Sequence, residues 1–364
     1  YKGKYLLEVS GRYDGTSRFP KEDRFGFFPS FSAGWRISEE NFMQGASSWL
    51  SNLKFRASYG ELGNQIVLKR LPNGQRVQDY YPYVPSLNTG NSDYNIGNGP
   101  LPIVTAAGLV SPTLTWESVN TRNFGLDASF LKGRLDLTAD VFVRETTDML
   151  LRVGLPDILG ADEPAENGAD LETKGWELTL NWRDKIGDNW KYGVGFNLWD
   201  NQTKITKYGG ENPSINGFYV GKDIGEIWGF ETVGLFESDA AADAAPDQSA
   251  VNGGAWEAGD IQYADLNGDG VIDRGTQSIN SETGEFEVGD LKVIGNTTAR
   301  YSFGFTPRVE YKGLSINMFF QGVFKRDYYP PQGPHAGFWP YNGSLVTQDF
   351  LDNSWSPTNP DAYF

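Results

Sequence analysis

Apolar and polar residues alternate along nine stretches of the chain, each seven or more positions long. In the clearest stretch, leucine, alanine and valine occupy every second position from Leu135 to Val143, and mainly polar residues lie between them. A period of two predicts a β-strand, because successive side chains of a strand point to opposite faces. A strand with a single apolar face must bury it in a protein core or in lipid.

Strand length and loop length favour lipid. The other alternating stretches are 7–14, 25–36, 53–59, 123–130, 176–182, 190–198, 301–311 and 314–321. Most approach the roughly 9 to 11 residues that a tilted strand needs to cross a bilayer. Tight polar connections at 132–133, 183–189 and 312–313 alternate with long ones at 61–116, 146–173 and 201–297. Short turns at one end and long loops at the other are typical of outer-membrane barrels.

The pattern therefore predicts an all-β fold, a segment of a membrane-spanning antiparallel up-and-down β-barrel. We expect about nine strands and their extracellular loops within residues 1–325. Residues 326–364 are expected to form an extracellular loop that leads to strands outside this chain, because single-chain bacterial barrels have even strand numbers. Pro29 and Pro307 fall inside strands and predict a bulge or kink at each. The alternative is a soluble β-sandwich, whose strands also alternate.

Composition narrows the function. No apolar run approaches the roughly 18 residues of a helical span, so membrane contact must come through strands. The net charge of −16 argues against a nucleic-acid partner, which would need a basic surface. The chain has no cysteine, which excludes disulfides. The single histidine, His335, has no partner at a spacing typical of acid–base catalysis, so we predict no enzyme activity.

One loop carries the residues of a metal site. Asp265, Asn267, Asp269 and Asp273 occupy positions 1, 3, 5 and 9 of a calcium-binding loop, and Val271 would contribute its backbone carbonyl at position 7. Thr276 stands where an EF-hand has glutamate, and the flanks do not read as amphipathic helices, so the loop is not an EF-hand. The alternative is a plain turn, since Asn-Gly and Asp-Gly form turns readily. We predict structural calcium here.

Longer sequence blocks resemble one family. GKDIGEIWGFETVGLFES (221–238), GDIQYADLNGDGVID (259–273), VIGNTTARYSFGFTPRVEYKGLSINMFFQGV (293–323), FGFFPSFSAGWRISEENFM, LKFRASYGELGNQ and LTWESVNTRNFGLDASF are similar to blocks of SusC/RagA-type TonB-dependent outer-membrane transporters, in the same order. The resemblance covers most of the chain and is weak in the long loops. It implies a barrel of about 22 strands with a plug, a SusD-like surface lipoprotein as lid, and energy delivered by TonB through a segment outside this chain.

The resemblance also implies a function: import of oligosaccharide or peptide across the outer membrane by a multi-pass barrel in contact with lipid. Aromatic loop residues are candidates for contact with the substrate or the lid, and equally for packing among the loops. They are Tyr80, Tyr81, Tyr83, Trp228, Phe338, Trp339 and Tyr341. Two alternatives remain at this point, namely a secreted all-β glycan-binding module or glycan-acting enzyme, and a passive porin.

Overall fold

The chain folds as two compact units in a computed structural model. The structure describes residues 1–70, 74–96, 99–105, 108–152, 164–210, 213–280, 283–329 and 346–362. The first unit comprises Tyr1–Glu211, Phe218–Ile224 and Ala299–Lys325, and the second comprises Asn212–Gly217, Gly225–Thr298 and Arg326–Phe364. Every strand predicted from the alternation lies in the first unit.

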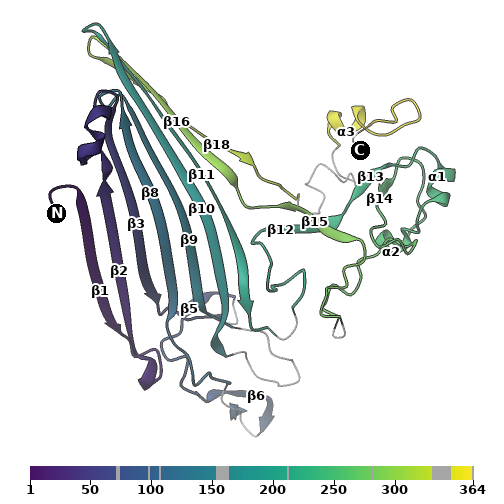
Figure 1. The fold of residues 1–364 in the computed structure, drawn as a ribbon. Helices are drawn as coiled ribbons and strands as arrows, with labels where there is room; N and C mark the ends of the chain where they lie inside the picture. The colour runs from purple at the N-terminus through teal and green to yellow at the C-terminus, as the bar shows by residue number, and fades with distance from the viewer. Residues whose placement is uncertain are drawn as a thin grey trace. The chain divides into compact units, whose positions relative to one another are not determined.

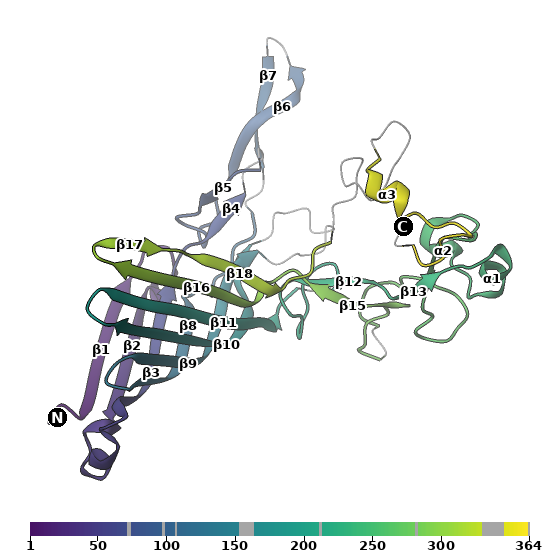
Figure 2. The same cartoon turned by 90° about the horizontal axis from the view of Figure 1, so that it is seen from above.

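A ten-stranded sheet forms most of the first unit (Figure 1). Its strands are β1 (Tyr5–Gly15), β2 (Phe25–Arg36), β3 (Leu50–Asn64), β8 (Glu117–Phe130), β9 (Leu135–Arg152), β10 (Ala165–Ile186), β11 (Trp190–Tyr208), β16 (Arg300–Tyr311), β17 (Leu314–Asn317) and β18 (Phe320–Lys325). They pair antiparallel in chain order, with β17 and β18 both paired to β16. The predicted up-and-down topology is confirmed, and the sheet is twisted and curved (Figure 2).

Connections alternate between the two ends of this sheet. At one end the chain turns through 37–49, which contains η2 (Ile37–Glu39) and η3 (Asn41–Ala46), and through 131–134, 187–189 and 312–313. At the other end it leaves through 16–24, which contains η1 (Lys21–Asp23), and through 65–116, 153–164, 209–299 and 326 onward. Bacterial barrels place short turns in the periplasm and longer loops outside. We therefore name these the turn end and the loop end.

The strands extend further toward the loop end than the alternation predicts. The pairing of β9 with β10 continues to Arg152 and Ala165, and β11 reaches Tyr208. The expected loop 146–173 therefore has most of its residues in strands. Beyond the lipid both faces of a strand meet water, so the ladder continues although the alternation has stopped. The connection 65–116 also contains two hairpins, β4 (Leu68–Arg70) with β5 (Arg76–Gln78) and β6 (Asn88–Ile96) with β7 (Gly99–Thr105).

The two prolines behave differently. Pro29 pairs with Gly11 without any shift of register between β1 and β2, so the bulge or kink expected there is not seen in the pairing. Pro307 also keeps its register with β11, but on its other side the pairing partner is divided between β17 and β18. The break between β17 and β18 lies opposite Pro307. Proline has no backbone N–H, so it removes one donor from the ladder at this point.

The second unit contains two small sheets and short helices. Strand β12 (Glu226–Phe230) pairs with β15 (Leu291–Asn296), and β13 (Thr232–Leu235) pairs with β14 (Ile261–Tyr263). The helices are α1 (Asp239–Ala244), α2 (Ser249–Asn252) and α3 (Gln348–Asp352). Its buried apolar residues include Phe236, Ile272 and Leu291. In the described part of the chain, no helix has both the length and the apolar character needed to cross a membrane.

Candidate functional site

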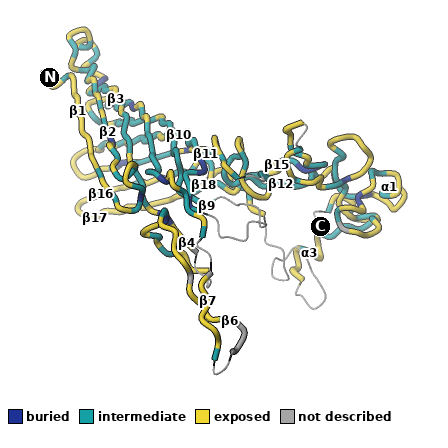
Figure 3. The backbone as a smooth tube through the Cα atoms, turned by 90° about the horizontal axis from the view of Figure 1, so that it is seen from below, coloured by how far each residue is buried: buried dark blue, intermediate teal, exposed yellow. Residues whose placement is uncertain are grey.

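The apolar positions of the sheet form one continuous face. Cross-strand pairing places Leu137, Leu180 and Phe196 in one row, which confirms the register predicted from the sequence. Many apolar side chains on this face are exposed, as for Leu7 (79%) and Phe124 (63%). Figure 3 shows few buried positions along the strands. A soluble sandwich would cover such side chains with a second sheet, so we assign this face to lipid.

The lipid-facing belt ends at a defined row near the loop end. The last apolar row contains Phe124, Val141 and Trp176. The next positions on the same face introduce Arg122 and Lys174, followed by further charged residues that form ion pairs. Those pairs are Arg122 with Glu145 (3.0 Å) and Lys174 with Glu172 (2.7 Å). Water must reach these charges. The outer surface of the membrane therefore lies between the apolar row that contains Val141 and the rows that carry these ion pairs.

A buried ion pair marks this boundary on β11. Asp200 lies opposite Trp176 on the outer register and is only 6% exposed. The Nε and Nη2 atoms of Arg300 donate to its two carboxylate oxygens, each at 2.6 Å, and the Tyr301 amide donates at 3.2 Å. The pair joins β11 to the first residues of β16. It thus fixes β16 where the connection 209–299 returns, at the end of the pairing between β11 and β16.

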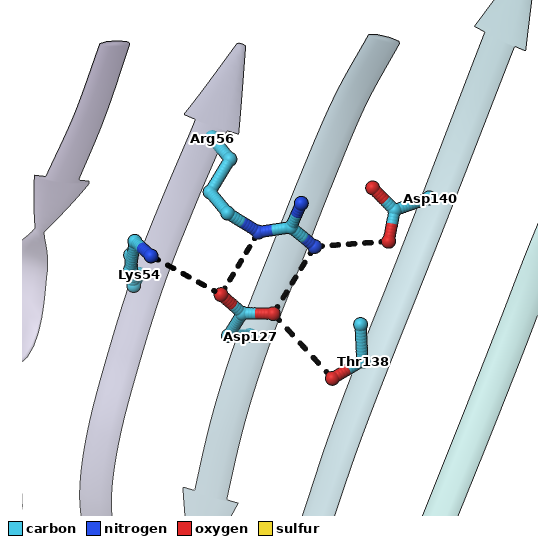
Figure 4. A network of polar contacts seen from close by, with 5 residues as sticks. All are labelled: Lys54, Arg56, Asp127, Thr138 and Asp140. Atoms are coloured by element: carbon cyan, nitrogen blue, oxygen red, sulfur yellow. Dashed lines mark hydrogen bonds and ion pairs between the residues drawn. The ribbon is translucent and has the colours of Figure 1, made fainter. Parts of the chain in front are cut away.

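The opposite face of the sheet is polar and carries a network of charges (Figure 4). Arg56 on β3 donates to both oxygens of Asp127 on β8, at 2.9 and 3.1 Å, and to Asp140 on β9 at 2.9 Å. Lys54 lies 3.6 Å from Asp127, and Thr138 donates to it at 3.4 Å. We call this the lumen face, because the other face is apolar and a barrel interior is polar.

The network depends on a glycine. Arg56, Gly125 and Asp140 are consecutive neighbours across β3, β8 and β9. A Cβ atom on Gly125 would lie 2.5 Å from an Asp140 oxygen and 2.6 Å from the Arg56 guanidinium carbon. Arg56 therefore reaches across β8 only because that strand has no side chain at this point.

A small core closes the loop end of the wall. It contains Phe19, Phe28, Val67, Leu114, Trp116 and Ala165. These residues come from the β1–β2 connection, strand β2, both ends of the long 65–116 connection, and the start of β10. Asn167 holds that connection further: its side chain accepts from the Thr115 amide at 2.9 Å and donates to the Thr115 carbonyl at 3.0 Å. The long loop is thus anchored at its base.

The predicted tyrosines differ in their surroundings. Tyr80 and Tyr81 are 58% and 59% exposed, and the Arg18 guanidinium lies 5.2 Å from the Tyr80 ring centre. Tyr83 is only partly exposed, and its hydroxyl accepts from Arg24 at 3.4 Å. Tyr80 and Tyr81 are therefore free to meet another molecule, whereas Tyr83 anchors its own loop.

The remaining aromatic candidates lie elsewhere. Trp228 is part of β12 in the second unit, where its indole nitrogen donates to Glu226 at 3.1 Å. It therefore belongs to a different unit from Tyr80, Tyr81 and Tyr83. Phe338, Trp339 and Tyr341 lie outside the described residues.

The predicted calcium loop folds as a sequence of tight turns. Asp265 accepts from the Gly268 and Gly270 amides at 2.6 and 2.9 Å, and both glycines have positive φ. Asn267 accepts from the Asp269 amide at 2.9 Å, Asp269 accepts from the Val271 amide at 2.8 Å, and Asp273 accepts from the Gly275 amide at 2.7 Å. Among the described residues no three acidic side chains converge as a metal cluster. These bonds suit a calcium loop and a plain turn alike, so calcium stays a prediction.

Sequence reasoning missed the residue that holds this loop. Asp290 is completely buried, and its two carboxylate oxygens accept from the Leu266 amide at 2.7 Å and the Asp273 amide at 2.9 Å. It therefore joins the beginning and the end of the loop. No local pattern marks Asp290, because it follows the motif by 17 residues and acts through backbone groups.

Comparisons with known proteins agree with an outer-membrane barrel wall. The family model described as "TonB dependent receptor-like, beta-barrel" matches residues 1–360. TonB-dependent receptor P26 of Formosa agariphila is 30% identical over 100% of this chain and 34% of its own length. TonB-dependent receptor SusC of Bacteroides thetaiotaomicron is 28% identical over 99% of this chain and 33% of its own length. The chain thus spans about a third of the curated relatives it matches.

Solved structures share the fold. The RagAB peptide transporter superposes with a TM-score of 0.70 at 21% identity, covering 100% of this chain and 36% of that one. The RagAB peptide importer in the open-open state gives 0.69 at 20% identity, covering 99% and 35%. The chain belongs to the TonB-dependent receptor β-barrel family and is SusC/RagA-like. It lies in the outer membrane, and this assignment replaces the soluble sandwich alternative.

Proposed function

We propose that this chain is the wall of an importer that moves a glycan or a peptide across the outer membrane with energy delivered through TonB. The supporting observation is a single sheet with an apolar belt on one face and the Arg56 network on the other, in a chain of this family. Such a wall separates lipid from a polar passage. The proposal assigns transport, and no catalysis, to the chain.

The substrate class is tested with the complete transporter. Cells that lack its gene are compared with wild-type cells for uptake of labelled oligosaccharide mixtures and of labelled peptide mixtures. We expect one class to lose uptake when the gene is removed, and a plasmid copy of the gene to restore it. Unchanged uptake of both classes would contradict the import function.

We further propose that the loop end binds a SusD-like surface lipoprotein that closes over the barrel. Four exposed large side chains of the 65–116 connection support an intermolecular surface here, namely Tyr80, Tyr81, and Leu101 and Val104 on β7. A loop that contacts only water rarely exposes so many large side chains. Deleting part of 327–364 from the complete transporter is expected to weaken co-purification of the lipoprotein while the barrel still folds. Full recovery of the lipoprotein with that deletion would count against a contact between 327–364 and the lipoprotein.

We also propose that Asp265, Asn267, Asp269, Val271 and Asp273 hold a structural calcium ion. Oxygen donors at alternate positions of a tight loop support this choice, because calcium prefers oxygen ligands. After chelation, calorimetric titration with calcium should give a binding heat that Asp269→Ala removes. The same heat in both proteins would place the calcium elsewhere. Asp243→Ala, in the neighbouring helix α1, serves as the control.

A further inference from the structure

The lumen face has a hollow that none of the assigned functions uses. It lies near the turn end, where β9, β10, β11 and β16 run side by side, and its volume is about 540 Å³. Its polar lining includes Asp136, Asn181, Arg183, Asn197, Thr306 and Arg308. These side chains come from four strands, and pairing brings them together on the lumen register.

Three glycines lie opposite polar residues of the hollow, and one of them, Gly195, lines it. Gly193 lies opposite Arg308, Gly195 opposite Thr306, and Gly304 opposite Asn197. A Cβ atom on Gly193 would lie 2.7 Å from Arg308 Nε, so the Arg308 side chain crosses β11 over bare backbone. The Arg308 guanidinium is therefore directed into the hollow. Arg56 crosses β8 at Gly125 in the same way.

The charges in the hollow do not balance. Arg183 donates to Asp136 at 2.7 Å and to the Gly133 carbonyl at 2.9 Å, so these two opposite charges compensate each other. Arg308 forms no hydrogen bond or ion pair with any residue that the structure describes, in contrast with Arg56, Arg134 and Arg300. One positive charge is left over.

Polar groups without partners surround this charge. The side chains of Asn181, Asn197 and Thr306 form no hydrogen bonds within the described part of the chain. They offer amide and hydroxyl donors beside the Arg308 guanidinium, whose planar fork matches the two oxygens of a carboxylate. A single uncompensated charge fits a singly charged carboxylate better than a doubly charged phosphate.

We propose that this hollow binds a carboxylate, with Arg308 as its anchor and Asn181, Asn197 and Thr306 as additional hydrogen-bond donors. The carboxylate comes either from an aspartate or glutamate of polypeptide inside the barrel, or from an acidic group of the substrate. The second source rests on the import function proposed above. The first requires only that this face lines the lumen.

Zero-length cross-linking of the complete transporter tests the site. Arg308→Lys places a primary amine there, and a carbodiimide then joins that amine to a carboxylate in contact with it, with loss of one water. Mass spectrometry identifies the partner. Linkage to an acid of the transporter's own polypeptide, other than Asp136 and Glu310, identifies the polypeptide source. Linkage only after adding the peptide acetyl-Ala-Glu-Ala-amide identifies the substrate source.

A control variant sets the expected yield. Arg134→Lys should become linked to Asp184, because the Arg134 guanidinium lies 3.2 Å from that carboxylate. The Arg308→Lys linkage should reach a comparable yield. Absence of linkage in both arms, with the control linked, would overturn the proposal, and so would linkage to Asp136 or Glu310 alone. Neither result depends on uptake, so failure here is distinguishable from failure of the import function.

Discussion

The barrel wall and the second unit keep their shapes by different means. In the wall, a continuous ladder of backbone hydrogen bonds joins ten strands, and the solvent on each side decides which residues each face carries. In the second unit the sheets have only two strands each, and side chains such as Asp290 hold the loops by accepting from backbone amides. A substitution in the wall therefore acts mainly through the face it changes, whereas one in the second unit acts through the backbone bonds it removes.

The largest expected effect tests the faces of the wall. Leu180→Arg places a charge in the middle of the lipid-facing belt and should cost roughly 2–4 kcal/mol of folding free energy. Urea titration of folding into lipid bilayers measures it. Thr179→Arg is the matched control, because the neighbouring side chain lies on the lumen face. Equal losses for the two variants would mean that the assigned register is wrong by one residue.

The next effect tests how the second unit is held. Asp290→Ala leaves the Leu266 and Asp273 amides without their buried acceptor, which should cost about 2–3 kcal/mol. We expect amide hydrogen exchange across 265–273 to become faster, while exchange in β9 and β10 stays unchanged. Asp243→Ala, an exposed change in helix α1 of the same unit, should have little effect. Loss of protection in the wall would show that the two units are not independent.

A smaller effect is expected on the lumen face. Arg56→Ala separates Asp127 and Asp140 from their shared cation, but these side chains are 28% and 13% exposed, so water compensates in part. We expect a loss of about 1 kcal/mol in urea titration. Gly125→Val should give at least the same loss, because its side chain would occupy the path of Arg56. Wild-type stability in Gly125→Val would contradict this description of the network.

The smallest effect depends on pH and lies at the turn end. Glu40 accepts hydrogen bonds from Tyr5, Trp35 and Lys4, which lower its pKa from 4.5 to about 2. A lowered carboxyl pKa contributes stability that is complete above pH 4.5 and is lost as pH falls toward 2. The difference in melting temperature between wild type and Glu40→Gln should therefore shrink from pH 6 to pH 3. A difference that stays constant would exclude ionisation of Glu40 as its source.

The sequence predicted the wall better than the loops for a physical reason. Lipid on one side and water on the other impose a period of two on every strand, so the chain itself records where each strand crosses the membrane. Past the Val141 row this constraint ends, and residues such as Glu145 and Glu172 continue the ladder without an alternating signal. The extension of β9 and β10 was therefore missed, as were the hairpins within 65–116.

The site residues show the same division. The motif from Asp265 to Asp273 is local, so its turns could be predicted, but the anchoring role of Asp290 could not. Tyr83 and Tyr81 look alike in the sequence, yet only Tyr83 is held by Arg24. The Arg56 network and the Arg308 hollow each need residues from at least three strands, and the glycine in each is meaningful only once its neighbours are known.

By itself, then, the sequence determined the strands, their lipid-facing side chains, their up-and-down order and the family. Those properties follow from local periodicity and from blocks of residues that are contiguous in the chain. Only the tertiary structure decided which lumen charges compensate each other, where glycine lets an arginine cross a strand, and which buried acid closes the acidic loop. Cross-strand register brings together residues that lie tens of positions apart, and an alternating pattern carries no record of those pairings.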